Sequence, residues 1–212
     1  MTSHGPFTDS SPESLDELVS QTRGLQPWRK AFHAFSGLVI AGGVTFLDLT
    51  RAQAMMILGG VGIVLLASDL VRLKSRRMNE IFFRSFRHLA SAREATGLAS
   101  STWYAFGALV AFATVPRPEA VSGLLVLGLA DPVASVIGQR YGRRPFLGGS
   151  IEGTAMFVLV SLAILVPRHA WPAAILATVV ATVAERRSWP LDDNFTVPVV
   201  TGLVLYATTS LL

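Results

Sequence analysis

"AMMILGGVGIVLLASDLVRL", residues 54–73, is the segment that decides the fold class of this chain. A run of about 20 residues with so little charge can cross the roughly 30 Å of hydrocarbon in a bilayer as an α-helix. A helix satisfies its own backbone hydrogen bonds, which lipid cannot do. The glycines of GGVG, residues 59–62, lie inside this run without an adjoining strand or lysine, so they indicate helix packing and not a nucleotide loop.

Six more apolar runs have the same character. Charged residues make up only 15% of the 212 residues, and the mean hydropathy of +0.49 is too apolar for an ordinary soluble domain. The sequence therefore predicts an all-α integral membrane protein with about seven transmembrane helices. The other runs cover residues 31–49, 96–115, 120–139, 151–167, 171–184 and 196–212, of which 171–184 is short enough to be tilted, re-entrant or sheltered by its neighbours.

Two segments lie outside the predicted spans. Residues 1–27 are polar, rich in Ser and mildly acidic, which indicates a disordered cytoplasmic tail ahead of a membrane domain over residues 28–212. Between the second and third spans, Met78, Ile81, Phe82, Phe86 and Leu89 recur at helical spacing among arginines. This pattern predicts an amphipathic helix in the membrane interface, with a solvated basic loop as the alternative.

The basic residues indicate the orientation of the chain. With seven spans, fifteen of the eighteen Lys and Arg residues fall in the tail and in loops on the same side. Loops rich in Lys and Arg stay in the cytoplasm, so the N-terminus and the longer loops are expected there. The sequence offers no basic surface with base-reading or stacking groups, so we expect no nucleic-acid partner. The absence of Cys excludes disulfides and thiolate metal sites.

Acidic residues gather on the predicted cytoplasmic side. Asp131 is the clearest, because it lies about 12 Å along a helix from the cytoplasmic end of the fourth span. An acid at the centre of a membrane helix costs roughly 2.5–3.5 kcal/mol and is kept mainly where it lines a polar cavity. Pro132 removes a backbone donor beside it. The acids within or next to the spans on this side are Asp69, Glu94, Asp131, Glu152, Glu185, Asp192 and Asp193.

Three short segments combine these acids with groups that suit phosphate. "GLADPVASVIGQRYGRRP", residues 128–145, has small residues that allow close approach, followed by three arginines. "GGSIEGT", residues 148–154, has Ser150 as a candidate cap of a helix whose free amides favour an anion. "LDDNFTVP", residues 191–198, holds Asp192, Asp193 and Asn194 just before the last span. The plain alternatives are a packing helix, ordinary positive-inside arginines and a first-turn acid.

The order and spacing of these segments resemble the CTP-dependent lipid kinases, the family that includes dolichol kinase, phytol kinase and the yeast-type diacylglycerol kinase. The chain departs from the family at Ala130, where the family has glycine, and at Gly149, where it has the lysine of K-S-x-E-G-T. A phosphate contact is then either missing or supplied by Arg143, Arg144 or another group. The resembling stretches are "RKAFHAFSG" (29–37), "DLVRL" (69–73), "REATGLASSTWYAFGALV" (93–110), "ADPVASVIGQRYGR" (130–143), "GSIEGT" (149–154) and "LDDNFTVP" (191–198).

The resemblance implies transfer of the γ-phosphoryl group of CTP to the hydroxyl of a membrane lipid alcohol that enters from the inner leaflet. Polyprenol or dolichol, phytol and diacylglycerol all remain open as the acceptor. Such transfer needs positioning and charge neutralisation, and Mg²⁺ or another divalent cation would be held by carboxylates and substrate phosphates. The implied catalytic residues are Asp131, Glu152 and Asp193; the implied metal ligands are Asp131, Asp192 and Asp193; the implied nucleotide contacts are His33, Ser135, Gly138, Arg140, Gly142, Arg143, Arg144, Ser150, Gly153 and Asn194.

Two other functions compete with this interpretation. A phosphatidate cytidylyltransferase also uses CTP and a metal in the membrane, but its histidine, double-glycine and aspartate-rich closing signature is absent, and "LDDNFTVP" occupies that end. A cation-coupled transporter would also place carboxylates within its spans, although no convincing internal repeat supports it.

Overall fold

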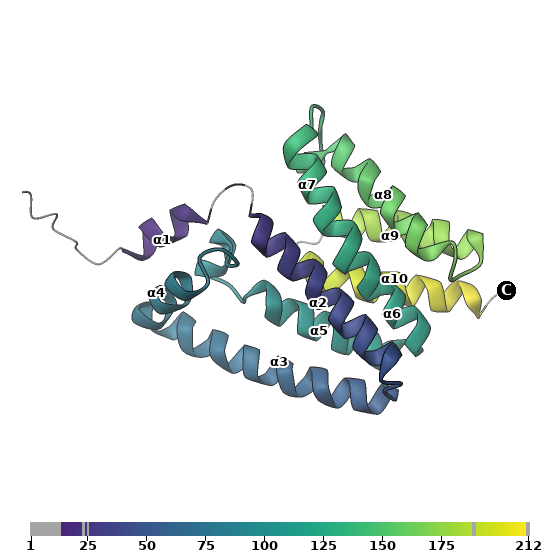
Figure 1. The fold of residues 1–212 in the computed structure, drawn as a ribbon, viewed down its shortest axis with the longest axis horizontal. Helices are drawn as coiled ribbons and strands as arrows, with labels where there is room; N and C mark the ends of the chain where they lie inside the picture. The colour runs from purple at the N-terminus through teal and green to yellow at the C-terminus, as the bar shows by residue number, and fades with distance from the viewer. Residues whose placement is uncertain (1–13, 23, 25, 188–189, 211–212) are drawn as a thin grey trace, which may run out of the picture.

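The protein is almost entirely helical over the part that the computed structural model describes, which is residues 14–210 without 23, 25, 188 and 189 (Figure 1). The all-α fold class is therefore confirmed. In chain order the elements are α1 (Leu15–Gln21), α2 (Pro27–Phe46), α3 (Arg51–Lys74), α4 (Arg76–Ser85), η1 (Ala92–Ala95), α5 (Ser100–Thr114), α6 (Arg117–Leu125), η2 (Val126–Ala130), α7 (Asp131–Tyr141), β1 (Pro145–Phe146), β2 (Gly149–Ser150), α8 (Ile151–Leu165), α9 (Trp171–Arg186) and α10 (Asp193–Thr209).

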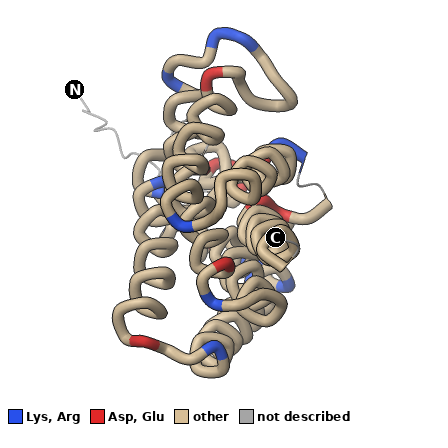
Figure 2. The backbone as a smooth tube through the Cα atoms, turned by 90° about the vertical axis from the view of Figure 1, so that its right-hand side faces the viewer, with Lys and Arg blue, Asp and Glu red and all other residues tan. Residues whose placement is uncertain are grey.

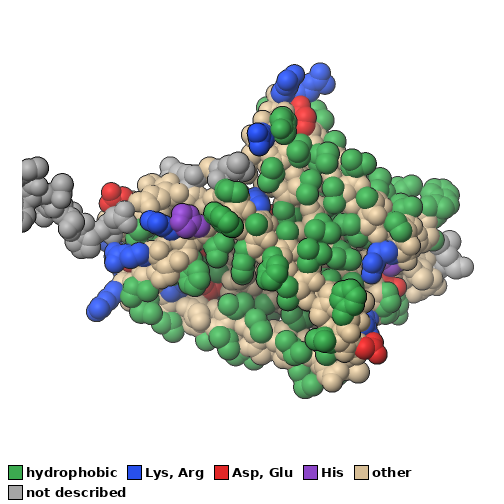
Figure 3. Space-filling model, viewed as in Figure 1, with side chains coloured by type: hydrophobic (Ala, Val, Ile, Leu, Met, Phe, Trp, Pro, Cys, Tyr) green, Lys and Arg blue, Asp and Glu red, His purple; other side chains and the backbone are tan. Residues whose placement is uncertain are grey.

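Each predicted span corresponds to a helix or, for residues 120–139, to the continuous segment formed by α6, η2 and α7. By length and composition, two of these segments could cross a membrane, namely α3 and the continuous segment Arg117–Tyr141. The crossing of the bilayer by all seven remains a prediction. Apolar side chains cover much of the face shown in Figure 3, and charged groups gather toward the ends of the helices (Figure 2).

The segment before α2 departs from the predicted tail. Residues 15–21 form α1, which begins at the Ser14 cap and buries Leu18 against Phe83 and Ala90. Residues 1–13 lie outside the described part of the chain. The amphipathic helix predicted between the second and third spans is α4, which buries Asn79 and Phe83. Its location in the membrane interface remains a prediction.

A buried polar network fixes the ends of α3, α4 and α5. The Arg72 guanidinium donates to Asp69 Oδ1 (2.6 Å), to Asn79 Oδ1 (3.0 Å) and to the carbonyls of Glu94 and Gly97. The other Asp69 oxygen accepts from the Ala99 amide and the Thr102 hydroxyl. Because both charges are paired and hydrogen-bonded, their burial is affordable.

Glycines let α10 pack closely against α5 and α6. A Cβ atom added at Gly107 of α5 would lie 2.8 Å from Phe195 Cα, and one added at Gly123 of α6 would lie 3.2 Å from Pro198 Cα. The distance at Gly107 is shorter than real Cβ contacts, and the Cβ added at Gly123 would also overlap the Pro198 carbonyl oxygen, so only glycine permits this approach. The start of α10 is thereby held against the centre of the bundle.

The helix that contains Asp131 is locally widened. Residues 126–130 form the π-helical turn η2, and α7 begins directly after it at Asp131. Pro132 has no backbone N–H, so the regular hydrogen-bond ladder is interrupted at this point. Turns of this kind inside α-helices are frequent at functional sites.

The connection between α7 and α8 is a small hairpin that the sequence analysis did not predict. Strands β1 and β2 pair antiparallel, with Pro145 opposite Ser150 and Phe146 opposite Gly149. The two turn residues, Leu147 and Gly148, both have positive φ angles. Ser150 then caps α8 by accepting from the Gly153 amide at 3.1 Å, as predicted.

Candidate active site

A cavity of about 980 Å³ opens where the predicted cytoplasmic ends of several helices meet. Its walls come from the start of α2, the segment around η1, one face of α7 along most of its length, the β1–β2 hairpin, the end of α9 and the start of α10. Predicted site residues that line it are His33, Asp131, Ser135, Gly138, Gly142, Arg143, Arg144, Ser150, Asp192, Asp193 and Asn194. Segments far apart in the sequence are therefore brought to one hollow.

Three of the predicted site residues do not line this cavity. Glu152 accepts a hydrogen bond from the Arg143 amide at 3.1 Å and, together with Arg140, borders a separate pocket of about 400 Å³. Gly153, in the first turn of α8, faces α7, where an added Cβ would approach the Ala134 carbonyl oxygen to 2.9 Å. The structure thus gives Gly153 a packing position and Glu152 a position beside the hairpin.

Asp131 and His33 face each other in the interior part of the cavity. Asp131 is 9% exposed, and its Oδ2 lies 3.9 Å from Nε2 of His33. The His33 ring meets the Tyr104 ring edge to face, with centroids 5.0 Å apart. Neither His33 Nε2 nor the Tyr104 hydroxyl has a hydrogen-bond partner in the described part of the chain. Asp131 and His33 are therefore available to a group bound in the cavity, whereas Tyr104 contacts His33 without lining the cavity.

The two adjacent acids at the start of α10 have different surroundings. Asp192 is the N-cap, and its Oδ1 accepts from both the backbone amide (3.1 Å) and the side-chain amide of Asn194. Asp193 Oδ1 accepts from the Asn194 amide at 2.9 Å. Burial, reinforced by the nearby charges of Asp131 and Asp192, raises the pKa of Asp193 well above its usual range. A cation would relieve this repulsion.

Glu185 and Arg186 are cavity residues that the predicted site did not include. Both lie in the last turns of α9, with side chains 10% and 11% exposed, and Arg186 Nε lies 2.8 Å from Glu185 Oε2. Burial raises the pKa of Glu185 to about 7, although Arg186 acts in the opposite direction. In the sequence, Arg186 and Arg187 looked like ordinary positive-inside residues, so no signal separated them from the others.

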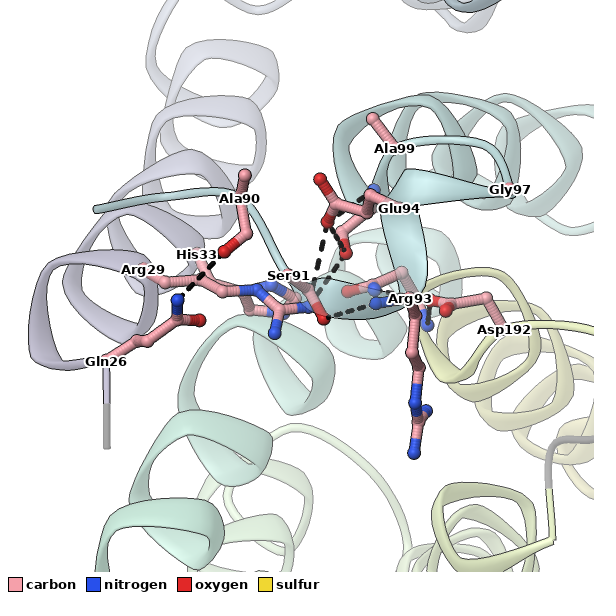
Figure 4. Close-up of polar contacts among 12 residues, drawn as sticks. Gln26, Arg29, His33, Ala90, Ser91, Arg93, Glu94, Gly97, Ala99 and Asp192 are labelled. Carbon is pink, nitrogen blue, oxygen red and sulfur yellow. Dashed lines mark hydrogen bonds and ion pairs between the residues drawn. The ribbon is translucent and has the colours of Figure 1, made fainter. Parts of the chain in front are cut away.

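Further basic groups stand at the opposite wall, on α2. Arg29 donates to Ser100 Oγ at 2.8 Å and lies 4.0 Å from Glu94 Oε1, and Lys30 also lines the cavity. Gln26 donates to the Ala90 carbonyl, which ties the start of α2 to the segment before η1 (Figure 4). Figure 4 also labels Asp192, the residue before α10, which lines the same cavity.

The oxygen-rich set of Asp131, Asp192 and Asp193 fits a hard divalent cation in its chemistry, since such ions prefer carboxylate oxygen. Among the described residues, however, no three His, Cys, Asp or Glu side chains are arranged so that they could hold a metal ion by themselves. The donor set therefore suits an ion that takes most of its ligands from substrate and water, as Mg²⁺ commonly does.

The fold and the cavity define a helical protein that has two segments long and apolar enough to cross a membrane, and a cavity at one end of its bundle lined by both acidic and basic side chains. The chain is similar to the CTP-dependent diacylglycerol kinase 1 of Saccharomyces cerevisiae, with 25% identity over 211 aligned residues that cover 84% of this chain and 72% of the yeast protein. The resemblance to the CTP-dependent lipid kinase family is thus confirmed. No protein-family model and no solved structure matches the chain.

Proposed function

We propose that the protein is a lipid kinase that transfers the γ-phosphoryl group of CTP to the hydroxyl of a membrane lipid alcohol. The observation that carries the proposal is the convergence of Asp131 and Asp193 with several basic residues in one cavity of about 980 Å³. Carboxylates and cations together are what phosphoryl transfer requires for a metal–triphosphate complex. The similarity to the yeast kinase supports the choice of CTP as donor.

The roles follow from the positions of the two acids. Asp131 lies in the interior, beside the unpartnered His33 and Tyr104 groups, so it accepts the proton of the lipid hydroxyl. The hydroxyl oxygen bonds to the γ-phosphorus while the bond from that phosphorus to the β-phosphate oxygen breaks, and CDP leaves. Mg²⁺ would be held by Asp193 and Asp131 and would supply charge neutralisation on the phosphates.

Asp192 is assigned a supporting role. Its Oδ1 is occupied by the Asn194 amides at the start of α10, so it orients the segment that carries Asp193. The lipid chain would lie along α2, where Phe32 and Phe35 are exposed and from which Arg29 and His33 reach the cavity. Apolar contacts of this kind do not distinguish polyprenol, phytol and diacylglycerol by themselves.

The test uses the purified full-length protein in detergent with γ-labelled CTP, Mg²⁺ and a panel of lipid alcohols. We expect label in the lipid and release of CDP, whereas a cytidylyltransferase would release pyrophosphate. Asp131→Asn and Asp193→Asn should each lower transfer by about 100-fold or more. Asp48→Asn, an acid at the opposite end of the bundle, is the matched control and should keep full activity.

Two results would contradict the proposal. Unchanged transfer in both Asp131→Asn and Asp193→Asn would remove the site, provided that the variants elute as the wild-type protein does in size-exclusion chromatography. Cation flux in proteoliposomes without nucleotide, together with no transfer to any alcohol, would favour a transporter instead.

A further inference from the structure

Arg186 has a position that depends on the absence of a side chain at residue 149. Its guanidinium group lies directly over Gly149 of β2, so that a Cβ atom added there would overlap Nη1 and lie 2.7 Å from Cζ and 3.2 Å from Nη2. Any other residue at position 149 would displace the guanidinium. The hairpin and the end of α9 are therefore fitted to each other at this point.

The absence of a side chain at residue 149 leaves space for the Arg186 guanidinium. The backbone conformation at residue 149 does not call for glycine. The positive φ angles of the hairpin belong to Leu147 and Gly148, which form its turn. Gly149 itself is a strand residue paired with Phe146 and has no positive φ angle, a conformation that any residue can adopt. The Arg186 guanidinium accounts for the missing side chain.

The Arg186 side chain is a buried cation with unmet hydrogen-bonding capacity. It is 11% exposed and lines the cavity next to the hairpin. Its Nε lies 2.8 Å from Glu185 Oε2, but neither atom has a partner in hydrogen-bond geometry among the described residues. A buried guanidinium with free donors is costly, and an anion that enters the cavity would satisfy it.

The other arginines near the hairpin are less well placed for this task, because their side chains are open to solvent and water competes for their donors. Exposed positions of this kind are held by Arg140, Arg143, Arg144 and Arg187. The resemblance left open which group supplies a phosphate contact where Gly149 replaces a lysine. The Arg186 guanidinium reaches the same place from α9.

We propose that Arg186, seated over Gly149, binds the phosphate groups of the nucleotide in the cavity. Its planar fork of donors would contact two phosphate oxygens at once. This inference rests on the proposed function for the identity of the nucleotide, but it concerns binding and can be tested without any transfer of phosphate.

The experiment measures CTP binding to the purified full-length protein by equilibrium dialysis with Mg²⁺, separately from transfer. Arg186→Ala should weaken CTP binding about ten-fold or more, because a charge-assisted contact is lost, and Arg186→Lys should recover part of it. Gly149→Ala should have a similar effect, since the added Cβ displaces the guanidinium. The double variant Gly149→Ala with Arg186→Ala should bind no more weakly than Arg186→Ala alone.

Matched controls are available at the far side of the bundle. Arg168→Ala removes an exposed arginine that does not line the cavity, and Gly43→Ala adds a Cβ with no atom within 4 Å. Both should bind CTP as the wild-type protein does. In steady-state assays, Gly149→Ala should raise KM for CTP more than it lowers kcat, which an overall loss of fold would not do.

The outcomes separate this inference from the proposed function. CTP binding with equal affinity by wild type, Arg186→Ala and Gly149→Ala would overturn the inference and leave the kinase proposal standing. Arg186-dependent CTP binding without transfer to any alcohol would support the inference and overturn the kinase proposal. A wild-type protein that binds neither CTP nor inorganic tripolyphosphate would overturn both. If Arg186→Ala is poorly folded, Gly149→Ala and Arg186→Lys carry the test.

Discussion

The Nε2 atom of His33 on α2 lies 3.9 Å from Oδ2 of Asp131 on α7, and this nitrogen has no hydrogen-bond partner among the described residues. The two side chains come from helices that are about a hundred residues apart in the chain. They meet at the interior end of the cavity, where the lipid hydroxyl is proposed to react.

We expect His33→Ala to lower kcat by about 100-fold with little change in KM for CTP. The reason is that the His33 ring contacts Tyr104 and faces Asp131, the proposed proton acceptor, whereas Arg186 is proposed to bind the phosphates. Steady-state kinetics at varied CTP would measure this. His88→Ala, an exposed histidine beyond α4, is the control and should be unaffected. A rise in KM alone would show that His33 binds nucleotide instead.

The stability of the metal-free protein should fall as the pH rises from about 5 to 8. The pKa of Glu185 is raised to about 7 and that of Asp193 is raised as well, so the folded protein binds more protons in this window than the unfolded chain does. Stability is then fully present below the usual carboxyl pKa and is lost as these groups ionise. Thermal unfolding at each pH would measure it, and Glu185→Gln should flatten the curve. A stability that rises over this range would contradict the assignment.

Arg72→Ala should destabilise the fold by about 3–5 kcal/mol, since it leaves the buried Asp69 carboxylate without its partner. Arg76→Ala is the matched control, because Arg76 forms an exposed ion pair with Glu80 and should contribute about 0.5 kcal/mol or less. The free energy of unfolding in detergent distinguishes the two. Equal effects would mean that the buried network does not hold α3, α4 and α5 together.

Gly123→Ala should destabilise the protein by about 1–3 kcal/mol, because the added methyl group meets the backbone of α10 at Pro198. Gly60→Ala on α3 adds a methyl group with no atom within 4 Å, so it should be neutral or stabilising by up to about 1 kcal/mol. Unfolding free energies of the two variants give the comparison. A harmless Gly123→Ala would show that α6 and α10 can separate.

The helices could be predicted from the sequence because length and apolar character alone define them. The helices over residues 31–49 and 54–73 can be predicted without knowing which other helices they pack against. The seven-residue helix α1 could not be predicted in this way, since a single buried side chain, Leu18, gives no periodic signal. Its stability depends on Phe83 and Ala90, which are distant in sequence.

The presence of Asp131 and Asp193 in one cavity could be predicted, because acids within or beside apolar spans are unusual in a sequence. A site residue could not be predicted where a charged residue has an ordinary position in the sequence and only the folded structure distinguishes it. Arg186 is one of many arginines beside a span, and only its seat over Gly149 distinguishes it. Glu152 shows the opposite case, because its motif suggested a cavity residue and the hairpin placed it beside a smaller pocket.

The π-helical turn at residues 126–130 accommodates one residue more than a regular α-helix would hold there. Each residue of an α-helix turns the chain by about 100°. Deletion of a single residue from this turn would therefore swing Asp131, Ser135 and Gly138 together around the helix axis and away from the cavity. This turn sets the rotation of α7 about the helix axis relative to α6. A change in helix length of one residue would therefore disable the site without removing any of its side chains.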